Sequence, residues 1–392
     1  MVRVERALYL ASPAGRAALA GLPRELETED PVQAAARLRR TFGAAEAAAL
    51  GEQLALRGRA RARFGALPVE LFTAEGLEMM THPAVAARRA QRLKTLGLTT
   101  ADLTCGLGGD LSALLAAKVD AFGVERDAAT AVLGAANSGG RVVRGDALSP
   151  PCRVGRTAVV LDPSRRVGGV RTFDPRGFAP PWDACLELLQ QARAGVLKAP
   201  PGLAWAAVPP WCEVEAVQLG RDLRELALWA GASVRPGLRR AVLLPGTCEL
   251  TSEEPASSEV REQVGRYLHD PESCVTRAGL VEQLAAALDA WRLDVRVAYL
   301  SGDEARTHPM CATFEVLEVV DFGLKRLREL LRARGWQPGE IRRRAFPVEP
   351  DELRRGLGQL EGEPMALVCL TAGSRRLAVI GRRVRPERAE GG

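Results

Sequence analysis

Between residues 100 and 162, four short apolar segments each end in an acidic residue, and this arrangement constrains the fold more than any other feature. The four acids are Asp102, Glu125, Asp146 and Asp162. Helical segments separate the apolar ones, and such alternation of strand and helix is typical of a parallel sheet with right-handed crossovers. Because the carboxyl ends of parallel strands meet at one edge of a sheet, we expect the four carboxylates to line a ligand site there.

A glycine-rich turn, D-L-T-C-G-L-G-G-D from Asp102 to Asp110, lies between a predicted strand and a predicted helix. The apolar-leaning segment Leu93–Leu98 is expected to supply the strand, and Leu111–Lys118 the helix. Gly106 and Gly108 lack a Cβ, so a ligand can lie against bare backbone, and the helix start offers free N–H groups. Sites for NAD, FAD, nucleotides and S-adenosylmethionine (SAM) all use such a turn.

The acids at the strand ends discriminate among these ligands. Asp102 suits a cationic ligand and would repel a pyrophosphate. Glu125 can accept hydrogen bonds from both hydroxyls of a ribose, and Asp146 can accept one from an adenine amine. The pattern therefore favours a nucleoside that carries a positive charge, as SAM does at its sulfonium.

Four motifs in this region, D-L-T-C-G-L-G-G-D, V-E-R-D, G-D-A and L-D-P-S-R-R, resemble the successive motifs of class I SAM-dependent methyltransferases. More narrowly, they resemble bacterial proteins that pair such a domain with a C-terminal THUMP-like module. Segments Phe72–Glu78, Phe173–Pro175 and Pro180–Asp183 are similar to that group too, and the resemblance extends from about Phe72 to Arg382. It implies SAM as the cofactor, bound by Asp102, Cys105, Gly106, Gly108, Glu125, Arg126, Asp146, Ala147 and Asp162.

The resemblance assigns the turn Asp162–Arg165 to the substrate, with Asp162 and Pro163 as the catalytic residues. Amino-methylating relatives have Asp/Asn-Pro-Pro-aromatic at this turn. The Ser-Arg pair of this chain departs from that pattern and leaves the acceptor chemistry open. Uracil-methylating relatives use Asp-Pro-Pro-Arg with a cysteine nucleophile on a later strand, but neither Cys185 nor Cys212 lies in a fitting context.

Basic, aromatic and hydroxyl side chains near this turn and in the C-terminal module are the candidate substrate contacts. Arginine can bind a phosphate or stack on a base. Trp182 either stacks on the substrate or packs in the core, and Lys198 either contacts the substrate or extends its stem along the surface. The full set is Ser164, Arg165, Arg166, Trp182, Lys198, Arg343 and Arg344.

The predicted fold class is α/β, a Rossmann-like class I methyltransferase sheet with an N-terminal helical region and C-terminal α+β modules. Within the sheet domain, Asp222–Trp229 is predicted as a helix and Val167–Pro181 as a loop over the site. The last module is predicted with the order strand, helix, strand, strand, which fits a THUMP-like domain. The predicted domains are 1–71 (helical), 72–247 (methyltransferase), 248–312 (connecting, ferredoxin-like) and 313–385 (THUMP-like), with a tail at 386–392.

Positive charge gathers towards the C-terminal end. The 392-residue chain carries a formal charge of +6, and residues 325–392 contain sixteen Lys and Arg against nine Asp and Glu, so the remainder is close to neutral. A basic module on a neutral body indicates a polyanionic partner. THUMP domains elsewhere bind structured RNA, so the analogy of fold points to tRNA or rRNA. The alternative is that arginine is simply the usual surface residue of this chain.

Other classes of protein fit the sequence less well. No apolar run approaches the ~20 residues that a membrane span needs, and no apolar stretch follows the N-terminus as in a signal peptide, so we expect a cytoplasmic protein without a membrane partner. The eight cysteines include no C-x-x-C pair, so we expect neither a metal site nor a disulfide framework.

These observations predict a SAM-dependent methyltransferase that acts on a base of tRNA or rRNA. An alternative of a different class is an RNA-binding protein that retains SAM binding but has lost or altered catalysis, because the turn after Asp162 is unusual. Methylation of a small molecule or a protein fits the basic module less well. NAD-dependent oxidation lacks the G-x-G-x-x-G spacing and leaves Asp162 and Pro163 without a role.

Overall fold

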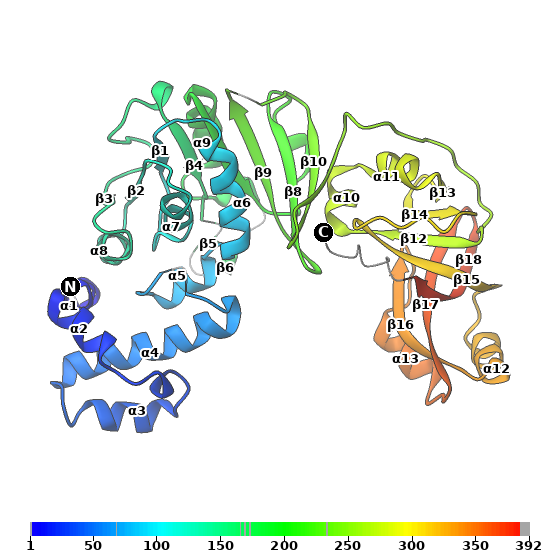
Figure 1. Ribbon diagram of the computed structural model, residues 1–392, viewed down its shortest axis with the longest axis horizontal. Helices are drawn as coiled ribbons and strands as arrows, with labels where there is room; N and C mark the ends of the chain where they lie inside the picture. The colour runs from blue at the N-terminus through cyan, green and yellow to red at the C-terminus, as the bar shows by residue number, and fades with distance from the viewer. Residues whose placement is uncertain are drawn as a thin grey trace, which may run out of the picture. The chain divides into compact units, whose positions relative to one another are not determined.

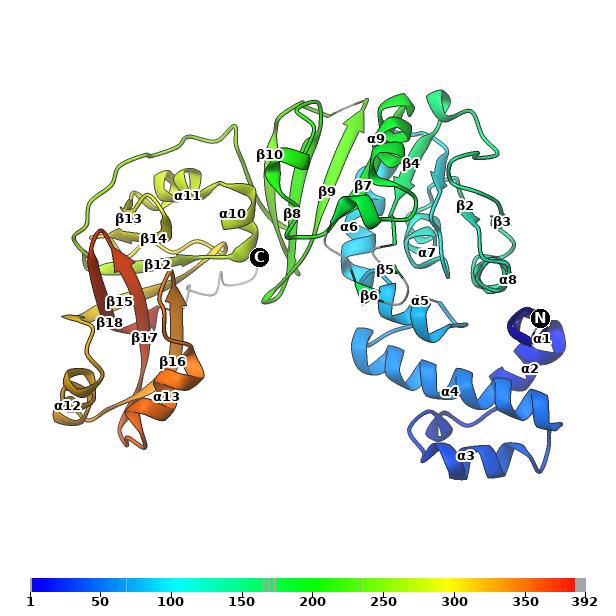
Figure 2. The same cartoon turned by 180° about the vertical axis from the view of Figure 1, so that it is seen from behind.

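The computed structural model describes residues 2–67, 69–164, 166–167, 170–171, 174–232 and 234–384. Two compact units divide the chain, and each has strands and cores of its own (Figures 1 and 2). The first unit comprises Met1–Glu213 and Glu225–Gly237, and the second comprises Val214–Arg224 and Leu238–Gly392.

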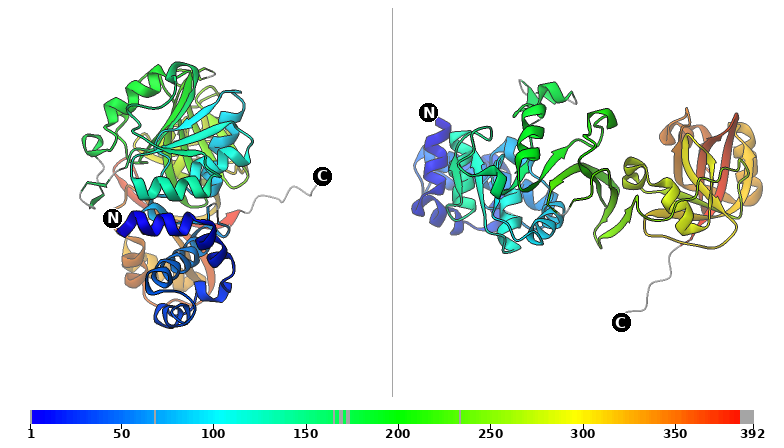
Figure 3. Two further views of the ribbon diagram at one scale, coloured as in Figure 1. Left: turned by 90° about the vertical axis from the view of Figure 1, so that its left-hand side faces the viewer. Right: turned by 90° about the horizontal axis from the view of Figure 1, so that it is seen from above.

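Helices dominate the N-terminal region, as predicted. Ser12 caps α2 and Asp30 caps α3, each by accepting a hydrogen bond from backbone N–H groups of the first turn. The long helix α4 buries Leu50 completely, and the left view in Figure 3 shows these helices, in blue, as a group of their own. Their bounds are α1 (Val2–Ala11), α2 (Pro13–Ala20), η1 (Arg24–Glu27), α3 (Pro31–Leu38) and α4 (Ala44–Phe64).

A helix pair leads into the sheet, as predicted, with α5 over Ala74–Met79 and α6 over Pro83–Lys94. Proline at the first position and a hydrogen bond accepted by the His82 imidazole start α6. The strand expected over residues 93–98 is wrong, because Leu93 belongs to α6 and is fully buried. The first strand begins only at Thr100.

Six strands of the first unit follow the order β9-β7-β4-β1-β2-β3. They run parallel except for β9, which is antiparallel to β7. Because β1 lies between β2 and β4, strand order reverses there, and open α/β sheets bind ligands outside the carboxyl ends at such a point. The strands are β1 (Thr100–Asp102), β2 (Ala121–Glu125), β3 (Val142–Arg144), β4 (Ala158–Leu161), β7 (Ala194–Ala199) and β9 (Asp222–Gly231). The helices between them are α7 (Gly109–Ala116), α8 (Ala128–Asn137) and α9 (Trp182–Gln191).

The helix predicted over Asp222–Trp229 is wrong, because this segment forms strand β9. Leu226–Gly231 pairs antiparallel with β7, and all residues from Glu225 to Ala230 are buried. Alanine and leucine are good helix formers, but helix propensity is small compared with tertiary packing. A run that is buried on both sides suits an inner strand instead, and here that packing decides the structure.

The loop predicted over residues 167–181 contains a short hairpin and a 3₁₀ turn. These elements are β5 (Arg166–Val167), β6 (Val170–Arg171) and η3 (Pro175–Gly177), while two more 3₁₀ turns of the first unit are η2 (Val154–Arg156) and η4 (Trp205–Ala207). Arg165 and Phe173, which the motif analysis singles out, lie outside the described residues.

The second unit holds strands in the order β11-β10-β8 and a seven-stranded sheet in the order β13-β14-β12-β15-β18-β17-β16. In the seven-stranded sheet every neighbouring pair is antiparallel except β16 and β17. The strands are β8 (Glu213–Leu219), β10 (Arg239–Leu244), β11 (Cys248–Thr251), β12 (Tyr267–Pro271), β13 (Trp291–Asp294), β14 (Val297–Gly302), β15 (Cys311–Asp321), β16 (Trp336–Arg344), β17 (Glu363–Ala372) and β18 (Arg375–Val384). The helices are α10 (Ser273–Ala278), α11 (Val281–Leu288), α12 (Leu324–Arg334) and α13 (Pro350–Leu357).

The seven-stranded sheet is covered on one face by α12 and α13, drawn in orange in Figure 2. Leu327 of α12 and Leu357 of α13 are fully buried in the core on that face. On β12, Asp270 accepts hydrogen bonds from Arg342 and Arg344 of β16, each at 2.6–2.7 Å. Because three strands separate β12 from β16 in the sheet order, the sheet must curve to bring these side chains together.

Candidate active site

The glycine turn leaves open space beside the end of β1. Gly106 and Gly108 have φ angles of 55° and 87°, which favour glycine. A Cβ added to Gly106 would meet nothing within 4 Å, and Gly108 directly precedes α7. Backbone N–H groups at a helix start are therefore adjacent to an open cradle, and this geometry fits the nucleoside and amino-acid groups of SAM.

A carboxylate at the end of β2 lies against this turn. Glu125 accepts a hydrogen bond from the N–H of Gly106 at 3.0 Å and another from the N–H of Asp127 at 2.7 Å. Arg126 is exposed. Cys105 packs beneath the turn against Gly123, and burial raises the pKa of its thiol well above the ordinary value. The side chain of Cys105 is therefore a packing group, and any contact with a ligand would come from its backbone.

The third predicted acid lies just beyond the end of β3. Asp146 is exposed and accepts a hydrogen bond from the N–H of Leu148 at 2.9 Å, while Ala147 is buried. Glu125 of β2 lies opposite Arg144 of β3, and Asp146 comes two residues after Arg144. An exposed carboxylate at this position suits a base amine.

Asp102, the last residue of β1, is only 2% exposed. Burial, reinforced by the nearby negative charge of Asp110, raises its pKa to about 8. Among the described residues, no cationic side chain forms an ion pair with Asp102. A buried carboxylate without a cation of its own is the chemistry expected for a site that receives a positively charged ligand.

Asp162 follows β4 and forms an ion pair with Lys198 at the end of β7. Lys198 is 8% exposed, and its Nζ also lies 2.5 Å from the hydroxyl of Thr81 and 3.6 Å from a carboxylate oxygen of Asp110. Burial opposes its positive charge, but the carboxylates of Asp162 and Asp110 outweigh that effect and raise the pKa of Lys198. Lys198 is therefore a fixed ammonium group beside the predicted catalytic turn.

A second cation, Arg89 of α6, completes this charge network. Its guanidinium pairs with Asp110 at the start of α7 and with Glu225 of β9. Burial raises the pKa of Asp110, but Arg89 and Lys198 outweigh burial, and the net shift is downwards. Sequence reasoning missed Thr81, Arg89 and Glu225. Only Asp110 carried a local signal, since it directly follows the glycine turn.

Two other candidates near the turn are held in place, Ser164 by its backbone and Trp182 by packing. Ser164 pairs through its backbone with Ala179. Trp182 is 5% exposed and packs edge-on against Phe178, with ring centroids 5.8 Å apart, which favours the core alternative. Pro163 is buried beside Asp162. Arg165 lies outside the described residues, and for Arg166 only the backbone is described, in β5.

The two candidates in the second unit are held by their own module. Arg344 donates to Asp270 and, at 2.5 Å, to the carbonyl of Pro271. Arg343 donates to the carbonyl of Phe346 at 2.8 Å and pairs with Glu349. Contact of these arginines with RNA is still a prediction, and the structure gives both of them intramolecular partners.

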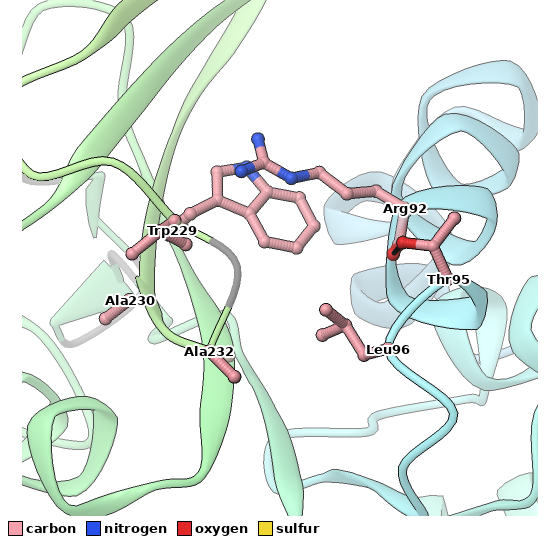
Figure 4. A pocket seen from close by; sticks show the side chains of 8 residues that line it. Arg92, Thr95, Leu96, Trp229, Ala230 and Ala232 are labelled. Carbon is pink, nitrogen blue, oxygen red and sulfur yellow. Dashed lines mark hydrogen bonds between the residues drawn. The ribbon is translucent and has the colours of Figure 1, made fainter.

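A small pocket on the first unit lies away from these groups (Figure 4). Arg92 of α6 stacks over the Trp229 ring at 4.1 Å from its centroid, and Gly195, near the start of β7, also lines the pocket. The volume is about 40 Å³, enough for about one or two water molecules and too small for a nucleoside. Since Lys198 lies at the other end of β7, this pocket is separate from the predicted site.

The part of the chain that the structure describes contains neither a membrane-spanning helix nor a metal-binding cluster. No helix there is long and apolar enough to cross a membrane. No group of three or more His, Cys, Asp or Glu side chains in those ranges is arranged to hold a metal ion.

The strand order, the glycine turn and the acids after β1, β2, β3 and β4 together define a class I methyltransferase fold. A crystal structure from Porphyromonas gingivalis W83, of a protein provisionally assigned as a methyltransferase, superimposes with a TM-score of 0.74 at 20% identity, covering 92% of this chain and 97% of that one. The model of a THUMP domain-like family matches residues 311–383, and that of a domain of unknown function matches residues 4–60.

An uncharacterized S-adenosylmethionine-dependent methyltransferase of Mycobacterium tuberculosis is 34% identical over 344 residues, covering 84% of this chain and 94% of the relative. This chain belongs to that family of SAM-dependent methyltransferases, with a THUMP-like domain near its C-terminal end. SAM is accordingly its cofactor.

Proposed function

We propose that this methyltransferase acts on RNA, either tRNA or rRNA. The observation that carries the proposal is the THUMP-like match at residues 311–383 within a segment of concentrated positive charge. Residues 325–392 hold sixteen basic side chains against nine acidic ones. A polyanion is the partner that such a surplus attracts, and THUMP domains elsewhere bind structured RNA.

For the cofactor, we assign the groups along the carboxyl edge of the first sheet. Asp102 receives the positively charged end, Glu125 the ribose hydroxyls and Asp146 the adenine amine. The open cradle at Gly106 and the buried carboxylate of Asp102, which forms no ion pair with a described residue, support this assignment. The remaining contacts are Cys105, Gly108, Arg126, Ala147 and Asp162. When bound, SAM supplies an activated methyl group.

For the substrate, Asp162 and Pro163 form the catalytic turn, and a base is the acceptor that the family resemblance predicts. Ser164, Arg165, Arg166 and Lys198 are the proposed contacts near the turn. The second candidate function is an RNA-binding protein that retains SAM but has altered catalysis. The Asp-Pro-Ser-Arg sequence of the turn motivates it.

The test is to incubate the protein with methyl-labelled SAM and total RNA from cells that lack the gene. We expect labelled RNA, and we expect Asp162→Ala to reduce the rate at least ~100-fold, because transition-state contacts of this kind contribute that much. The matched control is Asp120→Ala, which removes an exposed aspartate just before β2, at the opposite edge of the same sheet.

Each outcome bears on one part of the proposal. Labelled RNA that disappears with Asp162→Ala but not with Asp120→Ala supports enzyme and site together. A protein that binds SAM but labels no RNA contradicts the RNA substrate. Binding of RNA and SAM without turnover, equal in wild type and Asp162→Ala, would favour the second candidate function.

A further inference from the structure

The carboxylate of the catalytic turn already has a cationic partner. An amine acceptor at an Asp-Pro turn needs the carboxylate and the neighbouring carbonyl to accept its N–H groups. In this structure the Asp162 carboxylate instead receives the ammonium of Lys198. Thr81 accepts a second hydrogen bond from that ammonium, and Asp110 lies 3.6 Å from it, beyond a hydrogen bond. Lys198 therefore has little freedom to move away, and its third N–H group is left for a substrate oxygen.

The positive charge of Lys198 determines whether the site favours an amine nitrogen or a hydroxyl oxygen as the methyl acceptor. An amine nitrogen becomes positively charged as it takes a methyl group, and a fixed ammonium beside it raises the energy of that state. A hydroxyl oxygen loses its proton and develops negative charge, which an N–H donor stabilises. Because Asp110 and Asp162 hold the pKa of Lys198 above its ordinary value despite burial, the group acts as a donor and not as a base.

Among the described residues around this turn, the groups that base methylation would use are buried. Arg165 stands where amino-methylating relatives carry an aromatic ring, and Trp182 packs against Phe178. A cysteine nucleophile for C-methylation is also missing, because Cys185 and Cys212 are at most 1% exposed and burial raises the pKa of each to about 12. Ribose methylation needs neither a stacking ring nor a thiolate.

We infer that the acceptor atom is a hydroxyl oxygen, the 2′-hydroxyl of a ribose in RNA, with Lys198 donating to that oxygen and Asp162 taking its proton. A new O–C bond forms as the C–S bond of SAM breaks, and the electron pair of that bond stays on sulfur, which becomes a neutral thioether. The proton passes to the Asp162 carboxylate, whose side chain is 34% exposed and can release it to water. This inference rests on the proposed RNA substrate, and it replaces the base that the family resemblance predicts with a ribose hydroxyl as the acceptor.

The position of the label tests the inference. RNA labelled by the wild-type protein is hydrolysed completely in alkali, which cannot cleave next to a 2′-O-methyl ribose. We expect the label in alkali-resistant dinucleotides. Label in mononucleotides would overturn the inference while leaving RNA methylation intact, and absence of label from RNA would overturn both.

The role of Lys198 is tested by Lys198→Met, which keeps an unbranched side chain of similar bulk and removes the N–H donors. We expect kcat to fall ~100–1,000-fold, the usual effect of losing one donor to a developing oxyanion, with a SAM Kd within about threefold of wild type. Lys94→Met, an exposed lysine at the end of α6, is the control. A Lys198→Met enzyme that keeps wild-type kcat would overturn the inference.

A second variant covers the case in which Lys198→Met does not fold. Thr81→Val removes one partner of the ammonium and leaves every charge in place. As a positioning residue, Thr81 should affect kcat by about tenfold and leave the KM for RNA unchanged. An effect on KM alone, or none on either constant, would contradict the arrangement proposed for Lys198.

Discussion

Asp102 shows how burial at one residue prepares a site for a cation. At neutral pH its carboxyl group is largely protonated, because burial raises the pKa to about 8. A ligand with a positive charge favours the ionised form, so binding of SAM should release a proton. Binding of a cationic ligand at Asp102 should therefore depend on pH near neutrality, whereas binding at an exposed aspartate, which is already ionised, would not.

The raised pKa of Asp102 also predicts how stability depends on pH. The folded protein keeps a proton that the unfolded chain loses near pH 4, so the stabilisation is full below that value and is lost as pH rises through about 8. Between pH 5 and pH 8.5, we expect Asp102→Asn, which cannot ionise, to lose at least ~1 kcal/mol less unfolding free energy than wild type does, or ~1–2 °C in Tm. Thermal unfolding across this range measures the difference.

Asp120→Asn is the control for this measurement, since Asp120 is exposed and pairs with Arg141 at the other end of β2. Its unfolding profile should follow wild type at every pH. Parallel profiles for Asp102→Asn and wild type would show that Asp102 is ionised throughout and would contradict the assignment of a neutral carboxyl group.

The sequence predicts site residues where local pattern places them and misses those that only the fold brings in. Asp102, Glu125 and Asp162 each end a strand, so the alternation of strands and turns is enough to find them. Thr81 and Glu225 cannot be found that way, because they reach Lys198 and Arg89 across 117 and 136 residues of chain. Nothing in their immediate surroundings distinguishes Thr81 from an ordinary loop residue or Glu225 from an ordinary strand residue.

At the scale of elements, Arg89 ties α6 to α7 and to β9 through two buried carboxylates. We expect Arg89→Met to destabilise the protein by ~3–5 kcal/mol, because it leaves Asp110 and Glu225 without a counter-charge in the interior. Chemical denaturation measures this. The double variant Arg89→Met/Glu225→Gln should recover part of the loss.

Arg141→Met is the comparison for Arg89→Met. Its partner Asp120 is exposed, and side chains of such surface pairs contribute about 0–1 kcal/mol. If both substitutions lowered the free energy of unfolding equally, the buried network would contribute no more to stability than a surface ion pair.

Two strands, β9 and β16, differ from what their sequences indicate, and they do so for opposite reasons. β9 is rich in alanine and leucine, which predicts a helix, but its position beside β7 buries it on both sides. β16 contains Gln, Pro, Gly and three Arg, which do not predict a strand, although β17 pairs along most of its length. In both cases tertiary interactions outweigh residue propensities of a few tenths of a kcal/mol.

At the scale of the whole molecule, the distribution of paired and unpaired cations predicts how RNA binds. Within the ranges that the structure describes, several exposed cations of the C-terminal module form no ion pair: Lys325, Arg326, Arg332 and Arg376. Others are matched to carboxylates: Arg375 with Asp321, Arg382 with Glu363 and Arg383 with Glu340. Binding of an RNA phosphate by the unpaired cations costs less free energy, because no existing ion pair must be broken.

We therefore expect the triple variant Lys325→Ala/Arg326→Ala/Arg332→Ala to lower the slope of log Kd against log salt by ~0.7–0.9 for each phosphate that the protein no longer neutralises. The triple variant Arg375→Ala/Arg382→Ala/Arg383→Ala removes the same formal charge and should change the slope much less. Filter binding to RNA at several salt concentrations gives both slopes. Equal changes would show that net charge alone governs binding.

The contacts of Asp270 with β16, across the curved seven-stranded sheet, bear on where the C-terminal module begins. The THUMP-like match begins at residue 311, yet the carboxylate that holds Arg342 and Arg344 comes from β12, about forty residues earlier. A fragment cut at the start of the match would expose two arginines without their acidic partner and an unpaired edge along β15. The structural unit is therefore longer than the segment that the family model matches, and it begins no later than Tyr267.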